Sequence, residues 1–193
     1  MIPVGLIAGG RGSRLGTAHK CLVELGDGSC ALDRLLSACR DAATGPVVVA
    51  ANDATPFLAR GLPVVADSVP DAGPLAGIAA VLAHHHDAPA VLVLAADQPG
   101  LDAAALRALL AAWQSTGRLI VACDAAGRMH PLVAVVPVSL ASTVQDALRS
   151  GVHAVHRCWT AQAPQLVRLS ELALADLDHP ADLTRWRDAV RNI

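Results

Sequence analysis

Residues 6–16 read LIAGGRGSRLG, and Lys20 follows four residues later. The apolar run Val4–Ala8 stops at four glycines within eight residues, which indicates a strand followed by a phosphate-binding loop. Glycine has no Cβ and reaches positive φ, so successive backbone N–H groups can turn toward one anion. Arg11, Arg14 and Lys20 would supply mobile cations to the remaining phosphate oxygens. The loop suits a polyphosphate, and on the glycines alone an ordinary glycine-rich turn is the alternative.

This loop matches neither of the two common nucleotide-binding fingerprints. After Gly10-x-Gly12 the next glycine is Gly16, which is one residue too late for G-x-G-x-x-G. No Gly-Lys-Ser/Thr closes the loop either. The sequence therefore disfavours both a dinucleotide-binding Rossmann domain and a P-loop NTPase.

Length and composition predict one globular domain. The chain has 193 residues, of which 53% are hydrophobic and 17% charged, and this is enough for one full core. A net charge of −2 and an aromatic content of 2% argue against nucleic-acid binding. The five cysteines include no C-x-x-C pair, so we expect them to be reduced and buried. Without a signal peptide or a long apolar segment, we expect a soluble, cytoplasmic protein that does not bind membranes.

Strand-like apolar runs alternate with helical periodicity over the first 120 residues. The expected strands cover residues 4–8, 47–51, 63–66 and 90–96, followed later by 119–123, 132–136 and 166–169. The expected helices cover residues 31–42, 74–86, 103–115, 139–149, 152–160 and 180–190. Ser29 and Asp102 are the expected N-caps of the first and third helices. This order predicts a three-layer, Rossmann-like α/β domain with a mostly parallel central sheet.

Two aspartates come directly after apolar strands. Asp67 follows the strand at 63–66, and Asp97 follows the strand at 90–96. Ligands of open parallel sheets bind beyond the carboxyl ends of the strands, so both carboxylates can converge with the glycine loop. A carboxylate that ends so apolar a run is costly without a cation, and a divalent ion that also bridges substrate phosphates is a natural partner. A cap on the turn at Gln98-Pro99 is the alternative for Asp97.

The motifs in this order resemble the molybdenum cofactor guanylyltransferase family. Residues 7–20 are similar to its signature L-A-G-G-x-x-x-R-M-G-x-x-x-K, and Asp97-Gln98-Pro99 to its D-x-P motif. Residues 67–78 resemble its D-S-x…G-P-L-A-G-[IL] element, and His130-Pro131 resembles its H-P motif. Residues 178–183, DHPADL, look like N-T-P-E-D-L with aspartate for asparagine. The resemblance covers nearly the whole chain, and its more specific motifs lie before residue 100.

The resemblance implies a nucleotidyltransferase that moves GMP from GTP to molybdopterin or its molybdenum form and releases pyrophosphate. It implies catalytic roles for Arg14, Lys20 and Asp97, with Mg²⁺ held by Asp97. Asp178 would be a second metal contact, or else the cap of the last helix. The nucleotide-binding residues that it implies are Ile7, Ala8, Gly9, Gly10, Lys20, Asn52, Asp67, Gly77 and Asp97.

On the acceptor side the resemblance implies a contact through His130. Residues 1–100 would form the nucleotide-binding part of the single domain, and residues 101–193 the acceptor-binding part. Transient contacts with molybdenum cofactor carrier proteins or molybdoenzymes are implied as well.

The base and the acceptor stay open at this point. Gly10 and the Gly-Pro-Leu-Ala-Gly block favour guanylyl transfer, whereas the Asp97-Gln98-Pro99 triplet is common in the related cytidylyl branch. The base contact falls on either Asn52 or Ala50. A cytidylyl or sugar-phosphate nucleotidyltransferase is one alternative, and a non-catalytic nucleotide-binding paralogue is another.

Overall fold

The structure is a computed structural model that describes residues 1–8, 19–67, 69 and 72–191. Its strands form one sheet in the order β3-β2-β1-β4-β6-β5-β7. The strands are β1 (Val4–Ile7), β2 (Val47–Ala50), β3 (Val64–Val65), β4 (Ala90–Ala95), β5 (Ile120–Cys123), β6 (Met129–Pro137) and β7 (Gln165–Arg168). The α-helices are α1 (Ala31–Asp41), α2 (Thr55–Leu58), α3 (Pro74–His84), α4 (Ala103–Thr116), α5 (Ala141–Arg149), α6 (Val155–Thr160), α7 (Glu171–Leu174) and α8 (Pro180–Arg191). Two 3₁₀ turns, η2 (Lys20–Leu22) and η3 (Val138–Leu140), complete the described elements.

The sheet is mostly parallel, as the alternation of strands and helices predicts. β1 lies between β2 and β4 and is parallel to both. β6 is antiparallel to its neighbours β4 and β5, and β5 pairs in parallel with β7. All six residues of β4 are buried, which fits a run of apolar residues in the middle of a sheet covered on both faces. The expected α/β fold class is confirmed.

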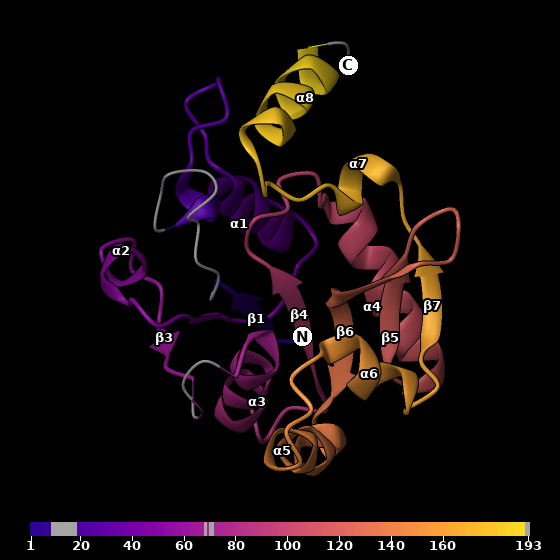
Figure 1. The fold of residues 1–193 in the computed structure, drawn as a ribbon. Coiled ribbons are helices and arrows are strands. Elements are labelled where there is room, and N and C mark those ends of the chain that lie inside the picture. The colour runs from indigo at the N-terminus through magenta and orange to yellow at the C-terminus, as the bar shows by residue number, and fades with distance from the viewer. Residues whose placement is uncertain (9–18, 68, 70–71, 192–193) are drawn as a thin grey trace.

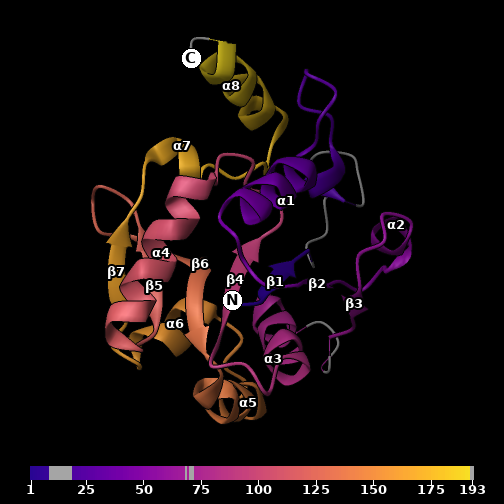
Figure 2. The ribbon, with the colours of Figure 1, turned by 180° about the vertical axis from the view of Figure 1, so that it is seen from behind.

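Helices cover both faces of the sheet and create two cores (Figure 1). Alternate strand residues such as Leu6 and Leu92 pack with α1 and α4. Their neighbours Ile7 and Val91 point to the opposite face and pack with α3, α5 and α6. The reverse view shows α1 and α4 in front of the sheet (Figure 2). The alternation of side chains along each strand thus divides one apolar run between two helical layers.

The ends of several elements differ from the expectations. Ser29 is not the N-cap of α1, because its hydroxyl is engaged with Asp27 and Arg34. Cys30 takes the capping position, where its backbone N–H donates to the Asp33 carboxylate over 3.1 Å. Asp102 does cap α4, accepting from the backbone of Ala105 over 2.8 Å. The short helices α2 and α7 were not expected, since four residues carry too little periodicity to be recognised.

β6 begins earlier than expected and includes His130 and Pro131. The pairing with β5 jumps from Val121 opposite Ala134 to Ala122 opposite His130, so the intervening residues of β6 bulge out. A proline, which has no N–H to donate, is tolerated at such a bulge. Because β6 is antiparallel to β4, its start lies at the edge of the sheet where β4 ends.

The C-terminal helix α8 is fastened to the segment before α1. Arg187 donates to the carbonyl oxygens of Leu25 over 2.9 Å and Glu24 over 3.0 Å. Trp186 is buried in a small third cluster with Leu25, Ala31 and Leu177. These contacts place the chain just before α8 next to the segment after the glycine-rich loop. No helix in the described part of the chain is long and apolar enough to cross a membrane.

Candidate functional site

The ends of β1 and β4 meet beside Lys20, at the edge of the sheet where the motifs predict a site. The N–H of Ala96 donates to the carbonyl of Ile7 over 3.1 Å, which places the last residues of the two strands next to each other. A cavity of about 30 Å³ lies there, lined by Ala8, Lys20, Cys21, Ala96 and Asp97. Lys20 and Asp97, which are 77 positions apart in the sequence, thus line the same cavity because β1 and β4 pair in parallel. Ala8 lines this cavity as well, and the roles of the three residues in nucleotide binding stay a prediction.

Asp97 is mostly enclosed and lies two residues beyond β4, a strand whose six residues are all buried. Burial raises the pKa of its carboxyl group to about 6, and the positive charge of Lys20 opposes part of that rise. Repulsion from Asp176 and Asp178 adds to it. A carboxylate held in this way has a high affinity for a further positive charge.

Lys20 is the only lysine of the chain, which has fourteen arginines. Its side chain is 16% exposed and forms an ion pair with Asp178. Asp178 does not close the start of α8 through its side chain. The Asp182 carboxylate does so, accepting from the N–H groups of Asp178 over 3.0 Å and His179 over 2.6 Å. The Asp178 side chain thus faces Lys20 inside the site, and its role as a metal contact stays a prediction.

Asp67 and Gly77 lie together where α3 crosses the end of the sheet. A Cβ on Gly77 would lie 3.2 Å from the Cβ of Ala50 and 3.4 Å from both Asp67 Oδ1 and Ile7 Cδ1. Glycine therefore allows α3 to approach the ends of β1 and β2 closely. Burial raises the pKa of Asp67. Ala50 is buried and Asn52 exposed, so Asn52 has the side chain that can reach a ligand.

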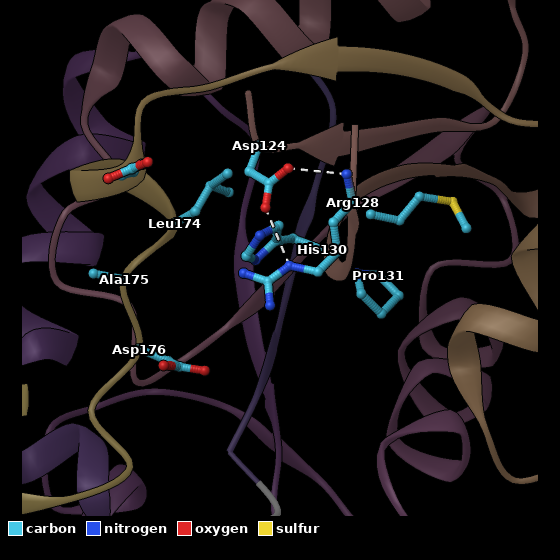
Figure 3. A pocket seen from close by; sticks show the side chains of 9 residues that line it. Asp124, Arg128, His130, Pro131, Leu174, Ala175 and Asp176 are labelled. Carbon is cyan, nitrogen blue, oxygen red and sulfur yellow. Dashed lines mark hydrogen bonds and ion pairs between the residues drawn. The ribbon is translucent and has the colours of Figure 1, made fainter. Parts of the chain in front are cut away.

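A second and larger pocket lies next to this edge (Figure 3). It has a volume of about 510 Å³, and its lining residues are Asp124, Arg128, Met129, His130, Pro131, Glu171, Leu174, Ala175 and Asp176. One wall is the β5–β6 turn with the start of β6, and the opposite wall is α7 with the two residues that follow it. The volume is within the usual range for pockets that bind small molecules.

The turn wall of this pocket is well ordered by hydrogen bonds. Asp124 accepts from the backbone N–H of Arg128 over 2.9 Å and from its Nε over 3.1 Å. Trp159 fixes the start of β6 by donating to the carbonyl of Pro131 over 2.9 Å. His130 Nε2 is buried without a partner among the described residues, and burial lowers the pKa of this histidine. His130 therefore offers a neutral ring with an unused nitrogen.

The family model for the MobA-like NTP transferase domain matches residues 4–166. This match spans β1 to β7 and includes Lys20, Asp97 and His130. The chain belongs to the MobA-like nucleotidyltransferase family. The resemblance inferred from the motifs is confirmed.

Curated members of this family are similar over most of their length. The molybdenum cofactor guanylyltransferase of Rhizobium meliloti is 38% identical over 157 residues, which cover 79% of this chain and 69% of that protein. The enzyme of the same name from Pseudomonas aeruginosa is 31% identical over 186 residues, covering 95% and 93%. The solved structure of molybdopterin-guanine dinucleotide biosynthesis protein A from Archaeoglobus fulgidus superposes with a TM-score of 0.80 over 100% of both chains at 20% identity. That likeness supports the nucleotidyltransferase fold.

Three of the predicted family residues, Gly9, Gly10 and Arg14, lie outside the described residues. The remaining predicted residues fall in two groups. Ile7, Ala8, Lys20, Asn52, Asp67, Gly77, Asp97 and Asp178 lie around the ends of β1, β2 and β4, whereas His130 lines the larger pocket. Among the described residues no group of three or more His, Cys, Asp or Glu side chains could hold a metal ion unaided.

Sequence reasoning missed Asp176. It lines the larger pocket, and its negative charge adds to the rise in the pKa of Asp97. It follows the unexpected helix α7 and belongs to no motif, although its position two residues before Asp178 is a signal that could have been followed. Arg128 was missed for a similar reason, because turn residues carry no periodic pattern.

Proposed function

We propose that this protein transfers GMP from GTP to the terminal phosphate of molybdopterin or its molybdenum form and releases pyrophosphate. The relatives named above support the reaction, and one observation of the structure carries it. Lys20, which follows the glycine-rich loop, shares a cavity with Asp97, which follows β4. A cation and a carboxylate at the carboxyl ends of parallel strands are what binding of a metal–nucleotide complex requires.

The chain's own groups act by holding charges in place. The acceptor phosphate is already an anion, so the transfer needs positioning and charge neutralisation more than a nucleophilic side chain. Lys20 would neutralise the β- and γ-phosphates, on which negative charge builds as the bond to the α-phosphorus breaks. The glycine-rich loop with Arg14 would supply further donors to the same oxygens.

The carboxylates of the site fit a magnesium ion. Lys20 forms an ion pair with Asp178 and lines the same cavity as Asp97, and the charges of Lys20 and Asp178 both act on the Asp97 carboxyl group. Mg²⁺ is commonly held by one or two carboxylates together with substrate phosphates, so a set of three protein ligands is not needed. Bound there, the ion would withdraw charge from the α-phosphate. Asp97 is the primary ligand in this proposal, and Asp178 the secondary one.

The larger pocket would take the ring system of the acceptor. Its walls carry the carboxylates of Asp124, Glu171 and Asp176 against the single guanidinium of Arg128, which Asp124 already holds. So acidic a pocket disfavours a phosphate but suits the ring N–H and amino donors of a pterin. The His130 ring lines the same pocket, and a small rotation of it would turn the unpaired Nε2 toward the ligand. The acceptor phosphate would then point toward Lys20 and Asp97.

Residues 1–100 would accordingly bind the nucleotide and residues 101–193 most of the acceptor. We also propose that the reaction takes place in the cytoplasm, because all five cysteines are buried free thiols. Contacts with carrier proteins or molybdoenzymes stay a prediction.

The decisive experiment is to measure pyrophosphate release from each of the four NTPs, with and without molybdopterin and Mg²⁺. We expect release only with GTP, acceptor and metal together. Preference for CTP would assign the chain to the cytidylyl branch. If pyrophosphate release requires a sugar 1-phosphate, the acceptor is that sugar phosphate and not molybdopterin. If GTP binds and no pyrophosphate is released, the protein is a non-catalytic paralogue.

The single lysine offers an independent test of the nucleotide site. Reductive ¹³C-methylation labels only Lys20 and the N-terminal amine, so an NMR spectrum contains one side-chain signal. We expect that signal to shift when GTP and Mg²⁺ are added and to stay in place with ATP. An unchanged Lys20 signal at saturating GTP would contradict a phosphate contact.

A further inference from the structure

Gln98 is the one polar side chain that is buried in the described part of the chain, with an exposed fraction of 5%. It is the middle residue of the Asp97-Gln98-Pro99 motif. Its Nε2 donates over 3.3 Å to the carbonyl of Leu174, the last residue of α7. Its Oε1 is buried and has no partner among the described residues. An amide that is only half satisfied is costly in a protein core, where an apolar side chain of the same length would pack without loss.

Gln98 is part of a longer contact between two segments. The N–H of Leu177 donates to the carbonyl of Asp97 over 3.2 Å. On the other side of Gln98, a Cβ on Gly100 would lie only 1.9 Å from the carbonyl oxygen of Leu172. The segments 97–100 and 172–177 therefore lie directly against each other, with the Gln98 side chain as the link in the middle.

Each of these segments carries a different part of the site. Asp97 lines the small cavity next to Lys20. Leu174 and Asp176 form one wall of the larger pocket, and Asp178, one residue beyond the contact, pairs with Lys20. α7 is only four residues long, so it has little helical stability of its own and depends on such contacts for its position.

We propose that Gln98 is a positioning residue that fixes the wall at residues 174–178 relative to the Asp97 carboxylate. Its effect on catalysis rests on the proposed function, because that wall would seat the acceptor whose phosphate must approach the nucleotide. The buried amide also cannot read the base.

The test compares Gln98→Met with wild type and with the matched control Gln114→Met, which changes an exposed glutamine on α4. Hydrogen exchange of the Leu177 amide and of its neighbours 172–178 reports the position of the segment without any substrate. We expect exchange of these amides to be at least about tenfold faster in Gln98→Met, while amides of β1 and β4 keep their protection. The melting temperature should be unchanged or higher, because the substitution removes an unsatisfied polar group.

With GTP, Mg²⁺ and acceptor, we expect kcat to fall at least about tenfold in Gln98→Met while the Kd for GTP stays within about twofold of wild type, because small misplacements of reacting groups are costly. Unchanged exchange at Leu177 would overturn the proposal. So would a kcat that falls only in proportion to a loss of folded protein. Because exchange is measured without substrates, failure of the proposed reaction would leave this readout intact and would be recognised separately.

Discussion

The two parts of the site are built differently. The cavity at Lys20 and Asp97 is about 30 Å³ in volume and stands at the ends of β1 and β4, whose parallel pairing fixes their positions. The pocket at His130 is about 510 Å³ in volume and lies between a turn and the short helix α7. Groups next to the ends of paired strands are held more rigidly than groups on a turn and a short helix, which can adjust to a larger ligand. We therefore expect substitutions in the first part to reduce turnover and substitutions in the second to reduce acceptor affinity.

The largest expected effect is that of Asp97→Asn. The amide is nearly isosteric but a weak ligand for a hard cation, so we expect turnover to fall at least about a thousandfold. The measurement is pyrophosphate release at saturating GTP, Mg²⁺ and acceptor. Asp146→Asn, an exposed carboxylate on α5, is the matched control and should leave turnover unchanged. If the Asp97→Asn variant keeps its turnover, Asp97 does not hold a metal ion that the reaction needs.

The same substitution should stabilise the protein in a manner that depends on pH. Burial raises the pKa of Asp97 from 3.8 to about 6, so the folded state binds this proton more tightly than the unfolded state. Ionising Asp97 therefore lowers the free energy of unfolding of wild type. This free energy falls as the pH rises from about 4 to about 6, and the full loss above pH 6 is roughly 3 kcal/mol. Asp97→Asn should be more stable than wild type at pH 7.5 and no more stable at pH 4. Urea unfolding at both pH values measures the difference, and equal gains at the two would contradict a buried ionised carboxylate.

The next largest effect is expected for Lys20→Ala. Removing a preorganised cation from developing negative charge typically costs about 3 kcal/mol, which corresponds to at least roughly a hundredfold in turnover. Stability at neutral pH should fall as well, because Asp178 loses its partner and the enclosed Asp97 loses the positive charge that opposes the rise of its pKa. The double variant Lys20→Ala/Asp178→Asn separates the two roles. If it regains full turnover, the unpaired Asp178 and not the missing ammonium was the cause of the loss.

The same contrast explains what could be predicted from the sequence. Lys20 was predicted because it follows a glycine-rich loop at the end of one strand, and Asp97 because it follows the apolar run of another. Parallel strands end at one edge of the sheet, so the two residues were expected to lie close together. The ion pair between Lys20 and Asp178 joins residues 158 positions apart and depends on how Arg187 fastens α8. No local pattern encodes such a contact.

The larger pocket was predictable only through His130. Its opposite wall is α7, whose four residues show no periodicity and whose polar neighbours look like a surface loop. Gln98 was recognised as part of a motif, but its burial became clear only when α7 was seen to pack against it. Propensity likewise favoured Ser29 as the cap of α1, and tertiary contacts with Asp27 and Arg34 overrode it.

His130→Ala should change the second part of the site without disturbing the first. We expect the KM for molybdopterin to rise about tenfold, which corresponds to one hydrogen bond and the packing of one ring, while the KM for GTP stays the same. His153→Ala, which removes an exposed histidine, is the matched control. Steady-state kinetics with each substrate varied in turn distinguishes the outcomes. An equal rise in both KM values would show that the two parts do not bind separate substrates.

The smallest effect is expected for Asp124→Asn, which tests how firmly the turn wall must be held. The amide oxygen can still accept the backbone N–H of Arg128, now 2.9 Å from Asp124 Oδ1, but the ion pair with the guanidinium is lost. Arg128 is 76% exposed, so the free energy of unfolding should fall by less than about 1 kcal/mol. The substitution makes the pocket less acidic, but the carboxylates of Glu171 and Asp176 and the ring of His130 stay in place. The KM for molybdopterin should therefore change by no more than about threefold and kcat not at all, because the ends of β1 and β4 are untouched.

Urea unfolding and the same kinetic assay check both expectations. A tenfold loss of kcat in this variant would show that the turn is coupled to Asp97, and that the two parts of the site act as one rigid unit.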